Sequence, residues 1–434
     1  MRIHVIGVGY VGLVTAACLA DSGNSVRCVD IDKKKIEELS NGKVPFHEPS
    51  LTEIVTRNIE NKRLSFSSEY DLNQSKNIIF LCVGTPDQGD GHVDLEALES
   101  VLKLISVNLR GKNYIFTKST VPLGTNNHIE NMLQQMTSEE TEIFVASNPE
   151  FLKEGDAVND FIRPDRIIIG TENIEIKKIA QEIYKPFNWN NKRLIFMSRQ
   201  SAELTKYASN AFLATKISFM NEISRICDNS DADIHEIRDG MGSDPRIGKD
   251  FLYAGLGFGG SCFPKDVRAL LKTYNSMDLP SHILDGVLKV NDKQIDYFLE
   301  KIKTVYGKNI GSKTFTIWGL SFKPNTDDLR ESLAIKLIQN LSPLVKEIYA
   351  FDPVSNEKSR KELLGVENIT FCKEKYEPIP ASDSLVICTE WKEFWNPDLN
   401  KLSTLRDKMI FDGRNVLDKP LLLKNNFKYI GLGV

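Results

Sequence analysis

The sequence predicts an α/β protein with two doubly wound parallel sheets, joined by a central helical region that contains a long helix. Short apolar runs typical of buried strands alternate with amphipathic stretches at both ends of the chain, whereas the middle shows sustained helical periodicity. A chain of 434 residues that is 41% hydrophobic is long and apolar enough for more than one core. We therefore expect three segments, at residues 1–197, 198–305 and 306–434.

The N-terminal segment contains a series of apolar runs that we expect to be strands. They are Ile3–Val8, Ser25–Val29, Ile78–Val83, Tyr114–Thr117, Ile143–Ala146 and Arg166–Gly170. Parallel strands need a crossover connection, usually a helix, so the amphipathic stretches between these runs indicate βα units and a parallel sheet.

The central and C-terminal segments follow different patterns. Helical periodicity dominates from Ser201 to about Val305 and is interrupted by the glycine-rich stretch Gly255–Gly260. Strand-like runs then return at Thr314–Trp318, Glu347–Phe351, Ser384–Cys388, Met409–Phe411 and Tyr429–Gly431. We expect a second, smaller doubly wound sheet, with a ligand-binding cleft between the two α/β domains.

The composition argues against several classes of protein. The 55 Lys and Arg residues against 59 Asp and Glu give a net charge of -4, so the chain as a whole does not attract nucleic acid or an anionic membrane. No apolar run reaches the ~20 residues of a membrane helix. The run from Arg2 through Ala20 could be a secretory signal, but three glycines interrupt it. Seven cysteines without CxxC spacing indicate reduced thiols, no metal site and a cytoplasmic location.

A glycine-rich turn follows the first expected strand. Gly7, Gly9 and Gly12 form a GxGxxG pattern ahead of a helical stretch, and this pattern brings backbone close to a pyrophosphate at a helix N-terminus. Asp30 follows the second strand at roughly the ~20-residue offset of an acid that binds a ribose hydroxyl, which favours NAD over NADP. We therefore expect a Rossmann-like dinucleotide-binding domain. A methyltransferase with a similar turn, and a turn that serves packing alone, are the alternatives.

Two further strands end in small hydroxyl residues and prolines. Thr85 and Pro86 follow one of these strands, and Ser119 and Thr120 follow the next. The carboxyl ends of strands face the ligand in open parallel sheets, so these residues are expected to contact the cofactor. Ordinary turn chemistry is the alternative interpretation.

One cysteine has the surroundings of a nucleophile. Cys262 follows the glycine-rich stretch and precedes the helical run Val267–Tyr274. A nearby helix start and Lys265 both favour the thiolate form, and the glycines permit a ligand to approach. The other six cysteines are better interpreted as buried structural residues.

Two more sets of polar residues suggest a reaction centre. Lys206 and Asn210 lie four residues apart on one helix face, where both could donate hydrogen bonds to an oxygen that gains negative charge. Glu150 and Glu154 follow the strand Ile143–Ala146, where a carboxylate could move protons. A solvated helix surface and acids at a helix N-terminus are the plainer interpretations.

Seven motifs in order along the chain carry a resemblance to a known family. They are GVGYVG at 7–12, NPEFLKEG at 148–155, ELTKYASNAFLATKISFMNE at 203–222, GMGSDPRIG at 240–248, GFGGSCFPKD at 257–266, GLSFKPNTDDLRES at 319–332 and DGRNVLD at 412–418. Together they resemble the UDP-glucose/GDP-mannose dehydrogenase family. This resemblance covers most of the chain and is highly specific.

The resemblance implies a fold and a reaction. The fold would have an N-terminal NAD domain, a central helical region with a dimer-forming helix and a C-terminal domain that binds the UDP part of the substrate. The reaction would oxidise the C6 alcohol of UDP-glucose to the carboxylate of UDP-glucuronate with two NAD in succession. A cysteine would hold the aldehyde as a thiohemiacetal and then as a thioester, which water cleaves.

The resemblance also implies roles for individual residues. The catalytic set is Cys262 as nucleophile, Lys206 and Asn210 as donors to the oxyanion, Asp266 and Thr120 near the catalytic water, and Glu150 as acid and base. The NAD contacts are Gly7, Gly9, Tyr10, Val11, Gly12, Asp30, Lys35, Thr85, Pro86, Thr120, Glu154, Lys265 and Arg330. The substrate contacts are Phe151, Leu152, Lys206, Asn210, Arg246, Phe251, Tyr253, Gly257, Gly259, Lys323 and Arg414.

Partner and substrate choice follow from a few of these positions. Arg246 matches an arginine that reaches the substrate across a dimer interface, so the resemblance implies a homodimer. Ser261 and the DPRIG motif favour UDP-glucose over GDP-mannose and UDP-N-acetyl amino sugars. Those substrates, a non-catalytic NAD sensor and a two-electron dehydrogenase with Lys206 as base remain alternatives. Ser50 stands where related sequences often place glycine, which leaves the geometry of that loop open.

Overall fold

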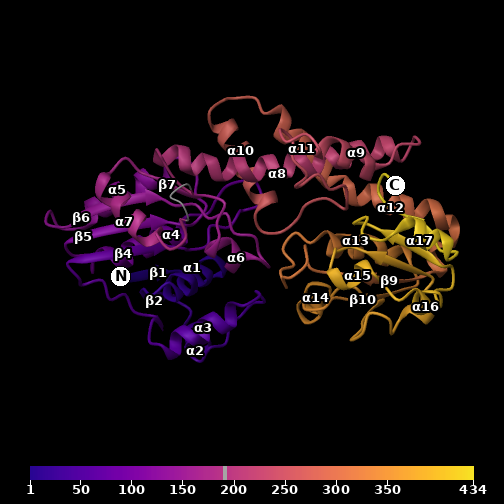
Figure 1. Ribbon diagram of the computed structural model, residues 1–434, viewed down its shortest axis with the longest axis horizontal. Coiled ribbons are helices and arrows are strands. Elements are labelled where there is room, and N and C mark those ends of the chain that lie inside the picture. The colour runs from indigo at the N-terminus through magenta and orange to yellow at the C-terminus, as the bar shows by residue number, and fades with distance from the viewer. Residues whose placement is uncertain (189–192) are drawn as a thin grey trace. The chain divides into compact units, whose positions relative to one another are not determined.

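A computed structural model describes residues 1–188 and 193–434 of the chain (Figure 1). It divides into two compact units. The first unit consists of Met1–Ser209 and Arg268–Asp278, and the second of Asn210–Val267 and Leu279–Val434. The chain passes from one unit to the other within the long helix α8 (Arg199–Cys227), within α10 (Phe263–Ser276) and again after Asp278.

The first unit is built on a sheet with the strand order β3-β2-β1-β4-β5-β6-β7-β8. Its strands are β1 (Arg2–Ile6), β2 (Ser25–Val29), β3 (Leu64–Ser67), β4 (Lys76–Leu81), β5 (Lys112–Thr117), β6 (Glu142–Ser147), β7 (Ile167–Gly170) and β8 (Leu194–Met197). Neighbouring strands pair in parallel except for β6 and β7, which meet in one antiparallel pair. The order reverses direction at β1, and ligands of open α/β sheets bind at such a reversal.

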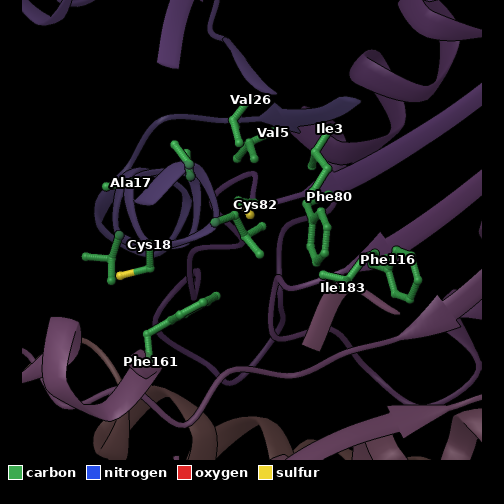
Figure 2. Close-up of a cluster of buried hydrophobic side chains, with 14 of the residues drawn as sticks. Ile3, Val5, Ala17, Cys18, Val26, Phe80, Cys82, Phe116, Phe161 and Ile183 are labelled. Atoms are coloured by element: carbon green, nitrogen blue, oxygen red, sulfur yellow. The ribbon is translucent and has the colours of Figure 1, made fainter. Parts of the chain in front are cut away.

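Helices connect these strands and bury their apolar faces. They are α1 (Tyr10–Asp21), α2 (Lys33–Ser40), α3 (Leu51–Glu60), α4 (Glu96–Ser106), α5 (Thr125–Met136), α6 (Ala157–Ile162) and α7 (Ile174–Tyr184). Helix α1 is buried from Gly12 through Ala20, so it is apolar on all sides rather than amphipathic. Figure 2 shows side chains of α1 in one cluster with residues of β1 and β4, which fixes the turn before α1 against the sheet.

The second unit repeats the same topology with the strand order β11-β10-β9-β12-β13-β14, and all its pairs are parallel. Its strands are β9 (Thr314–Trp318), β10 (Glu347–Phe351), β11 (Ile369–Phe371), β12 (Ser384–Ile387), β13 (Met409–Asp412) and β14 (Lys428–Ile430). Its helical elements, besides parts of α8 and α10, are α9 (Ile234–Gly242), α11 (His282–Asp292), α12 (Gln294–Tyr306), η2 (Gly307–Ser312), α13 (Leu333–Leu341), η3 (Ser342–Leu344), α14 (Asn356–Glu362), η4 (Ile379–Ala381), α15 (Lys392–Trp395), α16 (Leu399–Leu402) and α17 (Lys419–Lys424). Its core includes the fully buried Trp318, Phe315 and Phe411.

The predicted fold class is confirmed, and every predicted strand is present within a few residues of its expected ends. Three strands were not predicted, namely β3, β8 and β11. They are short and only partly buried, so they lack a continuous apolar run. The expected parallel sheet is present, and the single antiparallel pair between β6 and β7 was not predicted. The boundaries of the three predicted segments stay predictions.

Membrane insertion was not expected from the sequence. Among the residues that the structure describes, no helix is both long and apolar enough to cross a bilayer.

Candidate active site

The glycine turn between β1 and α1 is packed so closely that two of its glycines cannot carry a side chain. Gly7 has a φ of +89°, and a Cβ there would lie 2.7 Å from the carbonyl oxygen of Cys82. A Cβ on Gly12 would lie 1.9 Å from the carbonyl oxygen of Gly7. Gly9 caps α1 and has open space where its Cβ would be. The turn therefore exposes backbone at the helix N-terminus, which is the feature that a pyrophosphate needs.

Asp30 lies directly beyond β2 and is held beside this turn. Its Oδ2 accepts a hydrogen bond of 2.9 Å from the Val8 amide and one of 3.1 Å from Lys35 Nζ, and its Oδ1 accepts one of 3.0 Å from the Asp32 amide. Burial acts to raise the pKa of Asp30, but the two amides and Lys35 together lower it. The carboxylate is therefore ionised at neutral pH and oriented by the backbone, as an acceptor for a ribose hydroxyl should be.

A buried glutamate that the sequence did not single out links three loops of the first unit. Tyr10 donates a hydrogen bond from its hydroxyl to Glu48, and the Glu48 carboxylate also accepts bonds of 2.7 Å from the Gly155 amide and 2.8 Å from the Ala157 amide. Glu48 is 5% exposed. The cluster fixes the loop after β6 relative to the glycine turn. This loop was noted in the sequence only because Ser50 occupies a position where related sequences often have glycine, and Glu48 was not identified there.

Ser50 has a φ of +64° and caps α3 without a side-chain hydrogen bond. This left-handed conformation explains why glycine is favoured at that position.

The ends of β4 and β5 bring the predicted hydroxyl residues together. Register pairing places Leu81 opposite Thr117, so the following residues share one edge of the sheet. Thr85 Oγ1 donates a bond of 2.8 Å to the Thr120 carbonyl, and Ser119 Oγ donates one of 2.6 Å to the Val83 carbonyl. These residues form hydrogen bonds within the turns and also lie at the sheet edge where a ligand would bind. Their contacts with a cofactor stay a prediction.

Glu150 and Lys206 form a buried ion pair in the first unit. Lys206 Nζ lies 2.8 Å from Glu150 Oε1, and both side chains are less than 10% exposed. The second carboxylate oxygen accepts a bond of 2.6 Å from the Leu152 amide. Burial acts to raise the pKa of Glu150, but Lys206, the Leu152 amide and the charge of Lys118 together lower it. A solvated helix surface was the plain alternative for Lys206, and this pair rules it out.

One further cation and an aromatic ring lie beside this pair. The Arg166 guanidinium lies 4.0 Å from the centre of the Phe151 ring, and Lys206 Nζ lies 5.4 Å from it. Glu154 and Leu152, also predicted as ligand contacts, lie half-buried in the same loop.

Cys262 is half-buried at the residue before α10, whereas the other six cysteines are buried. Its carbonyl accepts the first hydrogen bond of the helix, from the Asp266 amide at 2.8 Å, and its Sγ lies 3.5 Å from Ser261 Oγ. A thiol in this position is exposed to the N-terminal end of the helix dipole, which favours the thiolate. The second unit therefore offers one accessible sulfur at a helix start.

A buried carboxylate one turn into α10 joins this sulfur to α8. Asp266 is fully buried, and its Oδ2 accepts a bond of 2.6 Å from Asn210 Nδ2. Its Oδ1 lies 2.5 Å from Lys265 Nζ. The Asn210 amide is thereby fixed by a charged partner, and Lys265 is engaged with the same carboxylate.

The glycines ahead of Cys262 permit close packing within the second unit. Gly257 and Gly260 have φ values of +115° and +81°, and a Cβ on Gly259 would lie 2.2 Å from the carbonyl oxygen of Glu331. The Gly260 amide donates a bond of 3.0 Å to the Arg330 carbonyl. The cysteine loop is thus held against the segment that carries the predicted cationic residues Lys323 and Arg330.

The predicted cations of the second unit differ in exposure. Arg414 follows β13 and donates a bond of 2.8 Å from Nε to the Cys388 carbonyl. Arg330 pairs with Asp328 at 2.7 Å and Arg246 with Asp244 at 2.5 Å, and their side chains are 63% and 87% exposed. Of the remaining predicted contacts, Tyr253 stacks under Arg238 at 4.6 Å, and Phe251 has a φ of +64°. Their roles in binding stay predictions.

A glycine turn that suits a dinucleotide, an ionised acid beside it and an accessible cysteine are features of a dinucleotide-dependent dehydrogenase. Three family models match the chain in succession, described as the NAD binding domain at residues 1–188, the central domain at 200–293 and the UDP binding domain at 316–419. The chain belongs to the UDP-glucose/GDP-mannose dehydrogenase family. The predictions of the family, of a dehydrogenase and of NAD as cofactor are thereby confirmed.

Individual relatives agree along the whole chain. The UDP-glucose 6-dehydrogenase of Rhizobium meliloti is 40% identical over 100% of this chain and 99% of its own, and that of Pseudomonas aeruginosa is 41% identical over 100% and 97%. Among solved structures, a UDP-glucose dehydrogenase from Pyrobaculum islandicum matches with a TM-score of 0.88 at 33% identity, covering 100% of this chain and 97% of that one. A UDP-D-ManNAc dehydrogenase from Pyrococcus horikoshii matches with a TM-score of 0.86 at 25% identity over 100% and 99%.

Proposed function

We propose that this protein oxidises the C6 alcohol of UDP-glucose to the carboxylate of UDP-glucuronate, with Cys262 as the covalent nucleophile. The observation that carries the proposal is the half-buried sulfur at the start of α10, in a chain whose other cysteines are buried. The names of the relatives from Rhizobium meliloti and Pseudomonas aeruginosa support the choice of UDP-glucose.

The residues of the first unit fit NAD. Backbone amides at the start of α1 would hold the pyrophosphate, the open space at Gly9 would admit it, and the ionised Asp30 would accept from a ribose hydroxyl. When bound, NAD supplies a hydride acceptor. We also assign to this site the contacts that the sequence predicted for Thr85 and Glu154.

The chemistry requires a nucleophile because an aldehyde has no second hydride to give until it becomes tetrahedral. The Cys262 thiol adds to the aldehyde carbon, the thiohemiacetal loses a hydride and a proton to become a thioester, and water cleaves the C–S bond and restores the thiol. Overall, one alcohol, one water and two NAD yield one carboxylate, two NADH and three protons. Sulfur serves the last step because a thiolate leaves more readily than an alkoxide.

Buried polar groups of this chain would manage charge and protons in these steps. Lys206 and Asn210 lie one turn apart on α8, and each donates toward a carboxylate in the structure, so each would donate to an oxygen that becomes negative. Glu150, ionised and fixed by Lys206, would accept a proton. Asp266 and Thr120 would position the water.

The number of NADH formed per sugar tests the proposal. With limiting UDP-glucose and excess NAD, absorbance should report about two NADH for each sugar consumed. One NADH per sugar would indicate a two-electron dehydrogenase, and none would indicate a sensor. The same assay with GDP-mannose and UDP-N-acetyl-mannosamine should give lower kcat/KM values, and a higher value for either would overturn the substrate assignment.

We propose further that the chain forms a homodimer through α8. Phe212, Phe219 and Ile226 are 63%, 45% and 62% exposed, and their seven-residue spacing puts them on one face of the helix. An exposed apolar stripe of this length supports a contact with a second copy. The exposed Arg246 would then be available to a substrate bound by that copy.

We also propose that the protein acts in the cytoplasm. Its cysteines, all within the described residues, form no disulfide. This fits a reducing compartment.

A further inference from the structure

A lysine that the proposed mechanism does not use is buried beside Glu150. Lys118 follows β5 and is 5% exposed, with its backbone amide bonded at 2.8 Å to the Leu81 carbonyl. Across residues 1–188 and 193–434, no carboxylate or hydrogen-bond acceptor partners its Nζ, which lies 5.9 Å from the centre of the Phe161 ring. Burying an ammonium without such a partner costs on the order of several kcal/mol. Packing alone therefore does not explain a lysine at this position.

Lys118 shares a pocket with Glu150 that leads outward. The pocket lies within the first unit and has a volume of about 50 Å³, which exceeds the roughly 10–15 Å³ that one water requires. Its lining passes from the buried Glu150 through the half-buried Asp160 to the exposed Asp165. Water can therefore connect the buried carboxylate and the lysine to the surface.

The surroundings of Lys118 make its amine exchange protons near neutral pH. Burial lowers the pKa of Lys118 to about 8, and the charge of Glu150 opposes this shift whereas that of Lys206 adds to it. The other charged or titratable groups that line the pocket are Asp160, Asp165, Arg166 and Tyr184. Among the basic groups of the pocket, the Arg166 guanidinium does not lose its proton. Lys118 is thus the base that can accept a proton there.

The proposed oxidation releases three protons at a centre where the candidate base, Glu150, and its partner Lys206 are both buried. A proton taken by Glu150 must leave before the next step can use that carboxylate. We propose that Lys118 is a positioning residue that acts through Glu150, its neutral amine taking the proton from the Glu150 carboxyl by way of water in the shared pocket and releasing it to solvent. Glu150 returns to carboxylate as the amine becomes ammonium. This inference rests on the proposed function.

Substitution of Lys118 by Met tests the proposal through a dependence on buffer. Without the amine, kcat should fall by about tenfold or more, with little change in the KM for the sugar. Small tertiary amines, which cannot condense with an aldehyde, should restore kcat in proportion to their concentration. Lys118→Arg should stay slow because guanidinium keeps its proton. In the unmodified enzyme, kcat should rise as the pH passes through about 8, and Lys118→Met should lose this dependence.

The matched control is Lys112→Met, at the other end of the same strand. Lys112 is 41% exposed and pairs with Glu175 on the surface, so kcat should not change. Restoration of kcat by Lys118→Arg, or a slow Lys118→Met variant that tertiary amines do not accelerate, would overturn the proposal. Should the Met variant fail to fold, Lys118→Gln is measured in the same way. A count of one NADH per sugar in the unmodified enzyme would refute the proposed reaction instead, independently of the buffer experiment.

Discussion

Cys262 differs from the other cysteines in its position rather than in its type. Cys82 and Cys28 are both buried, and burial raises the pKa of Cys82 to about 12 and that of Cys28 still further. Cys262 instead lies half-buried at the residue before α10, four residues ahead of Asp266, whose carboxylate is engaged with Asn210 and Lys265. A negative Asp266 that is paired in this way disfavours a thiolate less than an unpaired one would.

Replacement of Cys262 by Ser should separate the two oxidations. Serine is a weaker nucleophile and forms an ester, so the steady-state rate of carboxylate formation should fall by a factor of about 10² or more. Rapid-mixing absorbance should show no second NADH on the time scale of the unmodified enzyme. Cys227→Ser, at a buried cysteine on α8, is the control and should keep the stoichiometry of two. Normal turnover by Cys262→Ser would exclude this residue as the nucleophile.

The Glu150–Lys206 pair should be coupled in stability. Removing one partner leaves a buried charge uncompensated, so Lys206→Met should lower the free energy of unfolding by about 3–5 kcal/mol. The double variant Lys206→Met, Glu150→Gln should recover part of this loss, because neither position of the pair then carries an uncompensated charge. Denaturant unfolding of the four proteins of the cycle measures the coupling, and strict additivity would contradict it.

The sign of the pH dependence of this pair follows from the lowered pKa of Glu150. A carboxylate whose pKa is depressed by folding stabilises the protein above its unfolded-state pKa. This stabilisation is lost as the pH falls through the folded-state pKa. The difference between the unmodified protein and Lys206→Met should therefore shrink in acid.

At the scale of elements, continuous apolar runs in the sequence predicted the strands that are buried on both faces of a sheet. β4 and β5 are almost wholly buried and gave continuous apolar runs, whereas β3 and β11 lie at sheet edges, where Ser65 and Thr370 are exposed. A strand of three or four residues with one solvent-exposed face has too few apolar positions to give a detectable periodic pattern. Three of the four edge strands, β3, β8 and β11, were therefore not predicted, whereas the fourth, β14, was.

The residues of the candidate site also differ in whether they belong to a continuous motif or depend on contacts that are distant in the sequence. The glycine turn and the cysteine loop are continuous motifs, so their residues could be named from the sequence. Glu48 and Lys118 lie beside residues more than 30 positions away, since Glu48 accepts a bond from Gly155 and Lys118 lines a pocket with Glu150. Which distant groups meet them depends on strand order and on packing. A single sequence contains no local signal for these.

The loop before α3 offers a test of backbone strain. Ser50 has a φ of +64°, a region that costs an L-residue about 1–2 kcal/mol, while glycine gains about 0.4–1 kcal/mol of extra freedom when unfolded. Ser50→Gly should therefore raise the free energy of unfolding by roughly 0.5–1 kcal/mol. Ser50→Ala keeps the strain and should be nearly neutral, because the Ser50 side chain makes no capping bond. Equal stabilisation by both variants, in denaturant titrations, would show that strain is not the cause.

At the scale of the whole molecule, each compact unit repeats one topology, with the strand order reversing at β1 in the first and at β9 in the second. The same arrangement of six strands therefore serves two binding tasks, which the family models describe as NAD binding and UDP binding. What distinguishes the units is the turn after the first strand. Gly7 and Gly12 form a GxGxxG turn after β1, whereas the segment after β9 continues as Gly319, Leu320 and Ser321.

The two units share α8, whose exposed stripe of Phe212, Phe219 and Ile226 gives the last prediction. If this stripe covers the same stripe of a second copy, a charge at its centre would be desolvated without a partner. Phe219→Glu should then shift the mass measured by light scattering from dimer to monomer at micromolar concentration. Leu364→Glu is the control, because Leu364 is 84% exposed outside the stripe and its substitution should leave the mass unchanged. A monomeric variant that retains full kcat/KM would show that Arg246 of a second copy is not needed at the site, whereas an unchanged dimer would place the interface elsewhere.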